Sequence, residues 1–468
     1  MRWPLVSVII LNYNGKAILD LVRRSVQTIL DGTYRNVEII LADDCSTDGS
    51  AEELSKLCDS DRIRLTHTQK HSGVGAARNA GLRLARGAYI AFLDNDALPE
   101  PDWLSALVMR MEENPQWGSC ASRLMFADRP DIVNGIGSVL NELAHGNGVC
   151  IHEMYEFASA PTEVMYATGN GMIIRRRVLD EVGPFDEGFR FYGHDDSDIG
   201  IRIRNAGYEI GVAPEAVVWH LHSYSKHDPT MYYWDERNRL RFVLKHYHWS
   251  EILGFIVRDG IFHLKPGRVH PYVRAWWSAL TEEPSLWPYR WANRRLGPFL
   301  RRYARWFEKD HHLLIAPDNR QHAAAFAPLT EMHVGSNEED YLYHGWFWRE
   351  RWGEIPIRWA ARVASIRFSL NEHKSKLLVQ FVAHRGVPGV DLTLHLRRMD
   401  NGQITSAHKI RARLPDQPGL FNLREPCPLE PGRYHLIFEA NRAYTEEGPF
   451  PRRIAFGLSA LRFEGAGK

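Results

Sequence analysis

Three apolar runs near the N-terminus each end in polar side chains that could bind a nucleotide or a metal ion. These side chains are Asn12 and Tyr13 after the first run, Asp43 and Asp44 after the second, and Asp94, Asn95 and Asp96 after the third. A single acidic loop usually caps a helix or forms a turn. Asp94 and Asp96, however, present two hard oxygen ligands at alternate positions, which suits Mg²⁺ or Mn²⁺ that is also held by phosphates. The spacing therefore predicts a metal and phosphate site.

Two later clusters add candidates for acid–base or metal chemistry. Asp195, Asp196 and Asp198 open a helix that runs to Asn205, and His220 follows the strand 216–219. Acidic residues at a helix start can simply stabilise the helix dipole. A lone histidine is more often a structural residue than a ligand. Taken alone, each of the two clusters could have either a structural role or a role in acid–base or metal chemistry.

The elements that must position these residues alternate in type along the first 110 residues. We expect strands at 6–11, 37–42, 63–66 and 89–93, and helices at 18–30, 50–58 and 75–85. Strands with continuous apolar runs that alternate with helices form a parallel sheet covered on both faces. In such sheets ligands bind beyond the carboxyl ends of the strands. The polar side chains named above therefore meet at one edge of an α/β sheet.

The rest of the chain changes character twice. A helix is expected at 231–247, residues 250–330 are rich in Trp, Arg and Pro, and apolar alternation returns after about residue 335. Short alternating strands at 366–370, 377–382, 392–396, 434–438 and 454–458 predict an all-β sandwich. We divide the chain into an α/β domain at 1–250, a helical linker segment at 251–332 and a β-sandwich domain at 333–468.

Composition excludes several classes of protein. The 468 residues are 44% hydrophobic, and 58 Lys and Arg balance 57 Asp and Glu. This is the composition of a globular protein and argues against a general nucleic-acid binder. The five cysteines form no C-x-x-C pair, and we find neither a signal peptide nor an apolar run that could span a bilayer. We therefore expect a cytoplasmic protein with free thiols.

Taken in order, several segments resemble the inverting family 2 glycosyltransferases of the GT-A fold. They are S-V-I-I-L-N-Y-N-G, A-D-D-C-S-T-D-G-S, G-V-G-A-A-R-N-A-G-L, F-L-D-N-D-A, T-G-N-G-M-I-I-R-R, G-P-F-D-E-G-F and H-D-D-S-D-I-G-I-R-I-R-N-A-G-Y. The similarity covers residues 5–248 and is greatest to the bacterial rhamnosyltransferase-like branch. It implies a GT-A domain and a nucleoside-diphosphate sugar donor. It also implies a divalent metal, Mn²⁺ or Mg²⁺, and a glycan or lipid-linked acceptor in bacterial surface polysaccharide assembly. The C-terminal module resembles β-sandwich domains appended to some bacterial glycosyltransferases.

The same resemblance implies roles for individual residues. The nucleotide sugar would be bound by Asn12, Tyr13, Asp43, Asp44, Arg78, Asp94 and Asn95. Asp96 and His220 would hold the metal, with His222 as the alternative histidine. Asp196 would be the catalytic base, and beside it Asp195 replaces the glutamate that the family usually has. Asn170 and Gly171 would shape the acceptor pocket.

Two other functions and one surface remain open. A glycoside hydrolase also uses paired carboxylates, one on each side of the scissile bond, and a catalytically weak glycan-binding protein is a non-enzymatic alternative. The stretch Trp287–Lys309 interleaves arginines with aromatic residues, a pattern typical of peripheral contact with an anionic membrane face. The same aromatic residues could instead pack a domain junction while the arginines face water.

Overall fold

The structure is a computed structural model of the whole chain. It describes residues 3–58, 61–141, 143–151, 153–158, 160–221, 231–263, 269–281, 327–329, 331–334, 341–352, 355–384, 386, 388–400, 403–445 and 453–465. His222 and the stretch Trp287–Lys309 therefore lie outside the described residues. The chain divides into two compact units. The first comprises residues 1–151 and 158–307, and the second comprises 152–157 and 308–468. The domain boundaries proposed from the sequence stay predictions.

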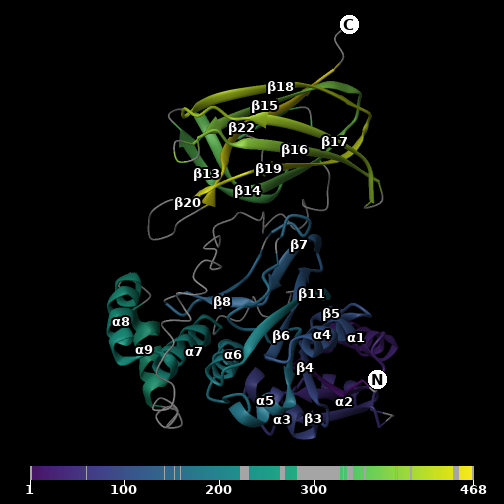
Figure 1. Cartoon of the computed structure of the whole chain (residues 1–468), viewed down its shortest axis with the longest axis vertical. Coiled ribbons are helices and arrows are strands. Elements are labelled where there is room, and N and C mark those ends of the chain that lie inside the picture. The colour runs from purple at the N-terminus through teal and green to yellow at the C-terminus, as the bar shows by residue number, and fades with distance from the viewer. Residues whose placement is uncertain are drawn as a thin grey trace. The chain divides into compact units, whose positions relative to one another are not determined.

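A mixed sheet of nine strands, counted within the described residues, forms the centre of the first unit (Figure 1). Its order is β3 (Ile63–His67), β2 (Val37–Asp43), β1 (Val6–Asn12), β4 (Tyr89–Leu93), β10 (Met172–Arg175), β6 (Trp117–Phe126), β11 (Glu209–His220) and β5 (Ala97–Pro99), with β7 (Arg129–Ile136) beside β6. The first four strands are parallel, and β10 then runs antiparallel to both of its neighbours. The predicted α/β sheet is confirmed, with β3, β2, β1 and β4 as its parallel part.

Alternate side chains of β1 enter two different cores, which shows that both faces of the sheet are covered. Val8 and Ile10 pack with α1 (Leu19–Asp31) and α4 (Trp103–Glu113). Ile9 and Leu11 pack in the other core, to which α3 (Val74–Leu84) and α6 (Asp195–Asn205) contribute. This division follows from the two-residue period of a strand. The predicted strand and helix positions hold to within a few residues, although α2 (Ser50–Ser55) ends earlier than expected.

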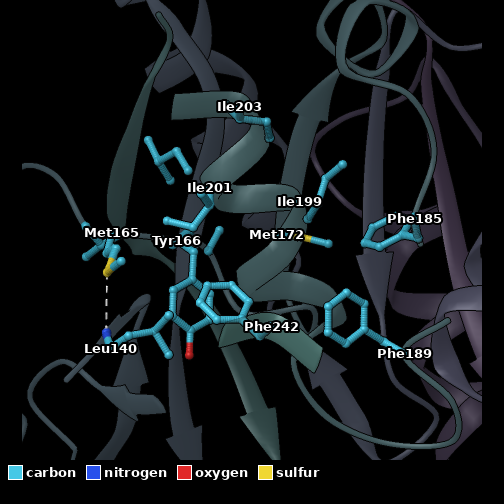
Figure 2. Packing of buried hydrophobic residues seen from close by; sticks show 14 of the residues in the cluster. Leu140, Met165, Tyr166, Met172, Phe185, Phe189, Ile199, Ile201, Ile203 and Phe242 are labelled. Carbon is cyan, nitrogen blue, oxygen red and sulfur yellow. Dashed lines mark hydrogen bonds between the residues drawn. The ribbon is translucent and has the colours of Figure 1, made fainter. Parts of the chain in front are cut away.

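The second of these cores extends well beyond the sheet. Figure 2 shows isoleucines of α6 packing with Tyr166 and Phe242. Phe242 belongs to α7 (Met231–His246), and buried residues of α8 (Trp249–His263) and α9 (Val269–Thr281) join the same core. None of the helices in the described part of the chain is long and apolar enough to cross a membrane. Short elements complete the unit: η1 (Lys16–Ile18), α5 (Arg176–Val182), β8 (Ser138–Leu140) and β9 (Gly146–Gly148).

The second unit is all-β, as the alternating apolar pattern predicted. Its strands form one hydrogen-bonded sheet in the order β17 (Gln403–Arg413), β16 (Asp391–Asp400), β19 (Gly432–Ala440), β14 (Ile355–Leu370), β22 (Phe456–Glu464), β15 (Lys374–Ala383) and β18 (Gly419–Leu429). The shorter β12 (Glu331–His333) pairs with β22, β13 (Leu342–Trp352) pairs with β14, and β20 (Tyr444–Thr445) pairs with β21 (Arg453–Ile454). The end strands β17 and β18 approach each other, so the arrangement resembles a barrel (Figure 1). Alternation identifies strands with one buried face but cannot tell two packed sheets from one curved sheet.

A short segment from the first half of the sequence packs within the second unit. Phe157 lies edge-on to His395 of β16, with ring centroids 5.6 Å apart. Glu156 pairs with Arg397 of the same strand at 2.6 Å. The second unit is therefore built partly from residues 152–157, which the sequence placed in the α/β domain.

Candidate active site

The carboxyl ends of β1, β2 and β4 bring three of the predicted residues together. Parallel register places Asn12 beside Asp43, and the Asn12 Nδ2 donates a 2.7 Å hydrogen bond to the Asp43 carboxylate. Asn95 donates to the Asn12 side-chain oxygen at 3.4 Å. The expectation that these strand ends share one edge is confirmed by this network.

Asp43 and Asp44 are buried, and both accept hydrogen bonds from the backbone of nearby loops. Asp43 accepts the Ser46 backbone N–H at 2.9 Å. Asp44 accepts the Gly73 N–H at 2.6 Å and contacts His71 Nδ1 at 2.7 Å. His71 in turn stacks face to face on the exposed ring of Tyr13, with centroids 3.7 Å apart. Tyr13 thus presents an aromatic face at the sheet edge, and the base-pocket roles of these residues stay predictions.

Asp96 and His220 face each other across the ends of β4 and β11. His220 Nε2 lies 3.3 Å from an Asp96 carboxylate oxygen, and the His220 Nδ1 contacts the Asn134 side-chain oxygen at 2.9 Å. Because the Asn134 oxygen accepts, this contact favours a proton on Nδ1 and an unprotonated Nε2, the form of the ring that can bind a metal; the metal-binding role of His220 stays a prediction. One carboxylate and one imidazole fit a divalent cation whose other ligands are phosphates and water. Within the described residues no group of three or more His, Cys, Asp or Glu side chains forms a complete metal site.

Arg78 is buried between two carboxylates. Its guanidinium pairs with Asp195, and its Nη2 lies 3.7 Å from Asp94. The rings of Phe92 and Phe185 flank it. Arg78 is therefore no ordinary surface arginine. Asp195 is thus an ion-pair partner of Arg78. The contact of Arg78 with the nucleotide stays a prediction.

Asp94 and Asp196 are joined by the segment 169–171. The Asp94 N–H donates to Asn170 Oδ1 at 3.3 Å, and the Gly169 N–H donates to Asp196 at 3.2 Å. Gly171, at φ 83°, donates its N–H to the Phe92 carbonyl of β4 at 2.9 Å. The buried Nδ2 of Asn170 has no partner among the described residues. An orphaned buried donor is costly, and a bound ligand could satisfy it.

Burial and neighbouring charges shift the pKa values of the carboxyl groups in the site. Burial raises the pKa of Asp94, and Asp96 and Asp195 add to this, whereas Arg78 and His220 oppose it. Burial, reinforced by the Asp195 charge, raises the pKa of Asp196 to about 6, although the Gly169 and Ser197 N–H groups stabilise its charged form. A carboxylate with a pKa near the operating pH can both accept and release a proton. Asp196 therefore has the acid–base properties of a general base.

Helix α7 fixes the loop that leads to Asp196, a role that the sequence did not reveal. The Asn238 side chain donates to the carbonyls of Arg190, Tyr192 and Gly193 at 2.8, 2.7 and 3.3 Å. This loop contains left-handed backbone at Phe191 (φ 59°), Gly193 (φ 89°) and His194 (φ 68°). Left-handed backbone at non-glycine residues persists only where the surroundings hold it in place. Asn238 supplies part of that restraint.

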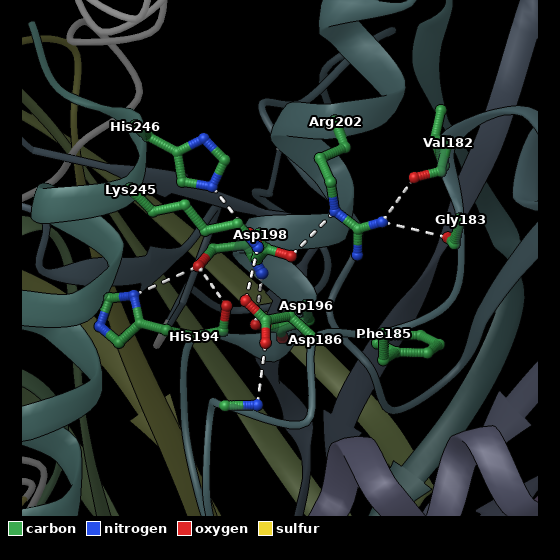
Figure 3. Close-up of polar contacts among 12 residues, drawn as sticks. Val182, Gly183, Phe185, Asp186, His194, Asp196, Asp198, Arg202, Lys245 and His246 are labelled. Atoms are coloured by element: carbon green, nitrogen blue, oxygen red, sulfur yellow. Dashed lines mark hydrogen bonds and ion pairs between the residues drawn. The ribbon is translucent and has the colours of Figure 1, made fainter. Parts of the chain in front are cut away.

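A buried ionic network continues from α7 to α6 (Figure 3). Asp198 contacts Lys245 Nζ at 2.7 Å, Arg202 Nε at 2.9 Å and His246 Nε2 at 2.7 Å. Lys245 also reaches Asp186 at 2.6 Å. The charges of Lys245 and Arg202 and the hydrogen bond from His246 hold the pKa of Asp198 well below its usual range, despite burial. Asp198 is therefore a structural anchor of the helix that begins with Asp195 and Asp196.

A further acid, Asp235, lies beside this loop. Burial and the neighbouring Glu236 raise its pKa to about 6. A Cβ at Gly193 would lie 3.2 Å from the Asp235 carboxylate, so Asp235 closely approaches the loop backbone. The sequence offered one signal for α7: a helix with Glu236, Arg237, Arg239 and Arg241 so closely spaced cannot keep all its charges on one solvent-facing side.

The N-terminal part of the chain is similar in sequence to known proteins. Residues 7–183 match the sequence model of glycosyl transferase family 2. Over 119 residues the chain is 39% identical to the putative teichuronic acid biosynthesis glycosyltransferase TuaG of Bacillus subtilis (strain 168), covering 25% of this chain and 44% of that protein. Over 142 residues it is 34% identical to the UDP-Glc:alpha-D-GlcNAc-diphosphoundecaprenol beta-1,3-glucosyltransferase WfaP of Escherichia coli, covering 30% of this chain and 54% of WfaP.

A solved structure, GalNAc-T7 with UDP, GalNAc and Mn²⁺, is similar with a TM-score of 0.45 and 18% identity over 59% of this chain and 55% of that one. The chain spans about half the length of the curated relatives that it matches. The family match covers the strands that carry Asn12, Asp43, Asp94 and Asp96. Residues 7–183 of the chain are therefore similar to glycosyl transferase family 2.

Proposed function

We propose that the chain is a metal-dependent inverting glycosyltransferase. It would move a sugar from a nucleoside-diphosphate sugar to a hydroxyl group of a glycan or lipid-linked acceptor in bacterial surface polysaccharide biosynthesis. The observation that carries this proposal is Asp196, which has a raised pKa and is hydrogen-bonded to the segment 169–171 that also holds Asp94. A proton acceptor thus lies next to the strand ends that the family match covers.

In this mechanism Asp196 takes the proton of the acceptor hydroxyl as its oxygen attacks the anomeric carbon. The bond between that carbon and the diphosphate oxygen breaks, and the electron pair leaves with the nucleoside diphosphate. A divalent ion held by Asp96 and His220 would supply charge neutralisation for the diphosphate. Because attack comes from the face opposite the leaving group, one displacement inverts the anomeric configuration.

Arg78 and Asp195 support this arrangement. Arg78 places a positive charge between Asp94 and Asp195. This charge lowers the repulsion among carboxylates gathered at one edge. Asp195, in turn, adds to the rise in the pKa of Asp196. The pair would therefore tune the base rather than transfer a proton.

The names of two relatives support the proposed class of acceptor. TuaG is named for teichuronic acid biosynthesis, and WfaP for a diphosphoundecaprenol-linked acceptor and a UDP-glucose donor. Within the family we assign the chain to the rhamnosyltransferase-like branch, on the resemblance of its motifs. The five cysteines all lie in the described residues and none of them forms a disulfide, which supports a reducing, cytoplasmic location.

The test is a panel of UDP-, dTDP- and GDP-sugars, including a nucleotide-activated rhamnose, with Mn²⁺ or Mg²⁺. Binding or slow hydrolysis of one donor is expected, and no response to any donor would contradict the proposal. Asp96→Ala should weaken metal-dependent donor binding. Asp196→Asn should keep donor binding and abolish transfer. Cleavage of a glycan without any nucleotide sugar would point to a hydrolase, and glycan binding alone to a lectin-like protein.

A further inference from the structure

Helices α8 and α9 each expose a row of large apolar side chains. On α8 the row is Trp249, Leu253, Ile256 and Val257, and on α9 it is Val273, Trp277 and Leu280. Leu253 is 69% exposed and Trp277 71% exposed. The positions recur at helical spacing, so each row forms one stripe. We call these seven residues the α8–α9 apolar surface.

The other sides of the two helices are already occupied. Phe255 of α8 and Ala275 of α9 are fully buried in the core of the first unit. The helices contact each other through Tyr272, whose hydroxyl donates to Asp259 at 2.7 Å. Each helix is therefore apolar both toward the core and toward solvent. Scattered exposed apolar residues are normal, but a row at helical spacing on each of two helices that contact each other indicates an interaction surface.

The charges beside this surface are basic. Arg258 and Arg274 are exposed, whereas the acid Asp259 is buried in an ion pair with Arg239 at 3.0 Å. Glu251 is half-buried and accepts the His248 N–H at 2.9 Å. Exposed Trp and aliphatic residues with neighbouring Arg and Lys are typical of segments that lie in an anionic lipid interface.

The α8–α9 apolar surface is linked to the candidate active site by a series of ring contacts. The Arg274 guanidinium lies over the Tyr233 ring at 5.0 Å, and Tyr233 contacts Trp234 at 5.1 Å between centroids. Trp234 contacts Phe191 at 4.4 Å. Phe191 belongs to the loop that Asn238 holds and that leads into Asp196. The surface and the proposed base are therefore parts of one packed region.

We propose that the α8–α9 apolar surface docks the first unit on an anionic phospholipid bilayer. The apolar rows enter the acyl boundary and the arginines contact lipid phosphates. Docking in this way would bring a lipid-linked acceptor to the site from the membrane side. That last step rests on the proposed function, whereas the docking does not. The location differs from the stretch Trp287–Lys309 that the sequence suggested, which lies outside the described residues.

The experiment measures binding of the full chain to vesicles by co-sedimentation. Vesicles of phosphatidylglycerol and phosphatidylcholine are compared with phosphatidylcholine alone, at low and high salt. The double variant Leu253→Ser, Trp277→Ser removes the two most exposed members of the surface. The matched control is Met109→Ser, a 49% exposed residue on α4 in the same unit. Wild type and the control should bind anionic vesicles, and the double variant should bind them with an affinity at least about ten times lower.

Circular dichroism and thermal unfolding of all three proteins show that each variant is folded, and donor binding is measured separately. Equal vesicle binding by the double variant and the wild type would overturn the proposal. So would binding that does not distinguish anionic from neutral vesicles. Loss of self-association in the double variant, without any vesicle binding by the wild type, would assign the surface to a second copy of the chain instead. If no donor binds but the vesicle result stands, the proposed function fails and the docking surface does not.

Discussion

Replacing Asp196 by Asn should abolish transfer and at the same time stabilise the fold at neutral pH. The reason is that burial and the Asp195 charge raise the pKa of Asp196 to about 6. In the unfolded chain the same carboxyl titrates near 3.8. The folded state therefore binds the proton more tightly than the unfolded state does. The ionised carboxylate costs folding free energy that a neutral amide of the same shape does not.

The sign and size follow from the two pKa values. Below about pH 4 the carboxyl group is protonated in both states, and the substitution should change little. Between about pH 4 and 6 the wild type loses stability relative to the variant, and above pH 6 the difference is complete. About two pKa units correspond to an upper limit of ~3 kcal/mol. Because the side chain is only partly buried, we expect about 1–2 kcal/mol, a rise of a few degrees in Tm.

The assay is thermal and urea unfolding of both proteins at pH 4 and at pH 7.5. Asp198→Asn is the matched control, because it changes the same chemical group two residues along the same helix. Asp198 carries the opposite shift, since Lys245, Arg202 and His246 stabilise its charge. The Asp198→Asn substitution, which removes this charge, should destabilise the fold by about 3–5 kcal/mol at neutral pH. If Asp196→Asn is also destabilising at pH 7.5, the raised pKa is not a property of the folded site and the reasoning is refuted.

Three further predictions concern residues around the base and the metal pair. Asn238→Ala removes the amide that donates hydrogen bonds to three loop carbonyls, and it should lower kcat by about 10–100-fold while the affinity for the nucleotide sugar is kept. Equal losses in kcat and in nucleotide-sugar affinity would show a general folding defect. Asn134→Ala should weaken Mn²⁺ binding about tenfold in titration calorimetry, because it releases the His220 ring, and unchanged affinity would remove Asn134 from the metal site. The transfer rate of the wild type should rise with pH through about 6, as the pKa of Asp196 requires, and a flat profile from pH 5 to 8 would argue against Asp196 as the base.

The sheet edge that we propose binds the nucleotide was predictable in its geometry, because the strand ends depend on local sequence pattern. The run 89–93 was expected as a strand and is β4 with the same bounds. Continuous apolar runs that end in polar residues define both the strands and their carboxyl ends. Asn12, Asp43 and Asn95 therefore meet as expected, because parallel register alone brings Asn12 to Asp43.

The surroundings of Arg78 were not predictable, because its partner is 117 residues away in sequence. Helical periodicity indicates on which side of α3 Arg78 lies. It does not indicate which acidic residue of a helix distant in sequence contacts Arg78 there. The same limit applies to the C-terminal unit. Its strands were predicted from alternation, whereas the pairing of β14 with both β19 and β22 depends on contacts across the whole unit.

Helix α7 shows why the base side of the site needs structure beyond the family match. Hydropathy describes α7 as a polar helix, yet Arg237, Arg239 and Arg241 are fully buried. Buried cations persist only where acids or carbonyl groups pair with them. Here those partners include Asp186 and the Gly188 carbonyl, both in the loop before Asp196. The match to family 2 ends at residue 183, so Asp196 and the helix that restrains its loop both lie after it. Variation in α7 would therefore change how the base meets an acceptor while the nucleotide side stays intact.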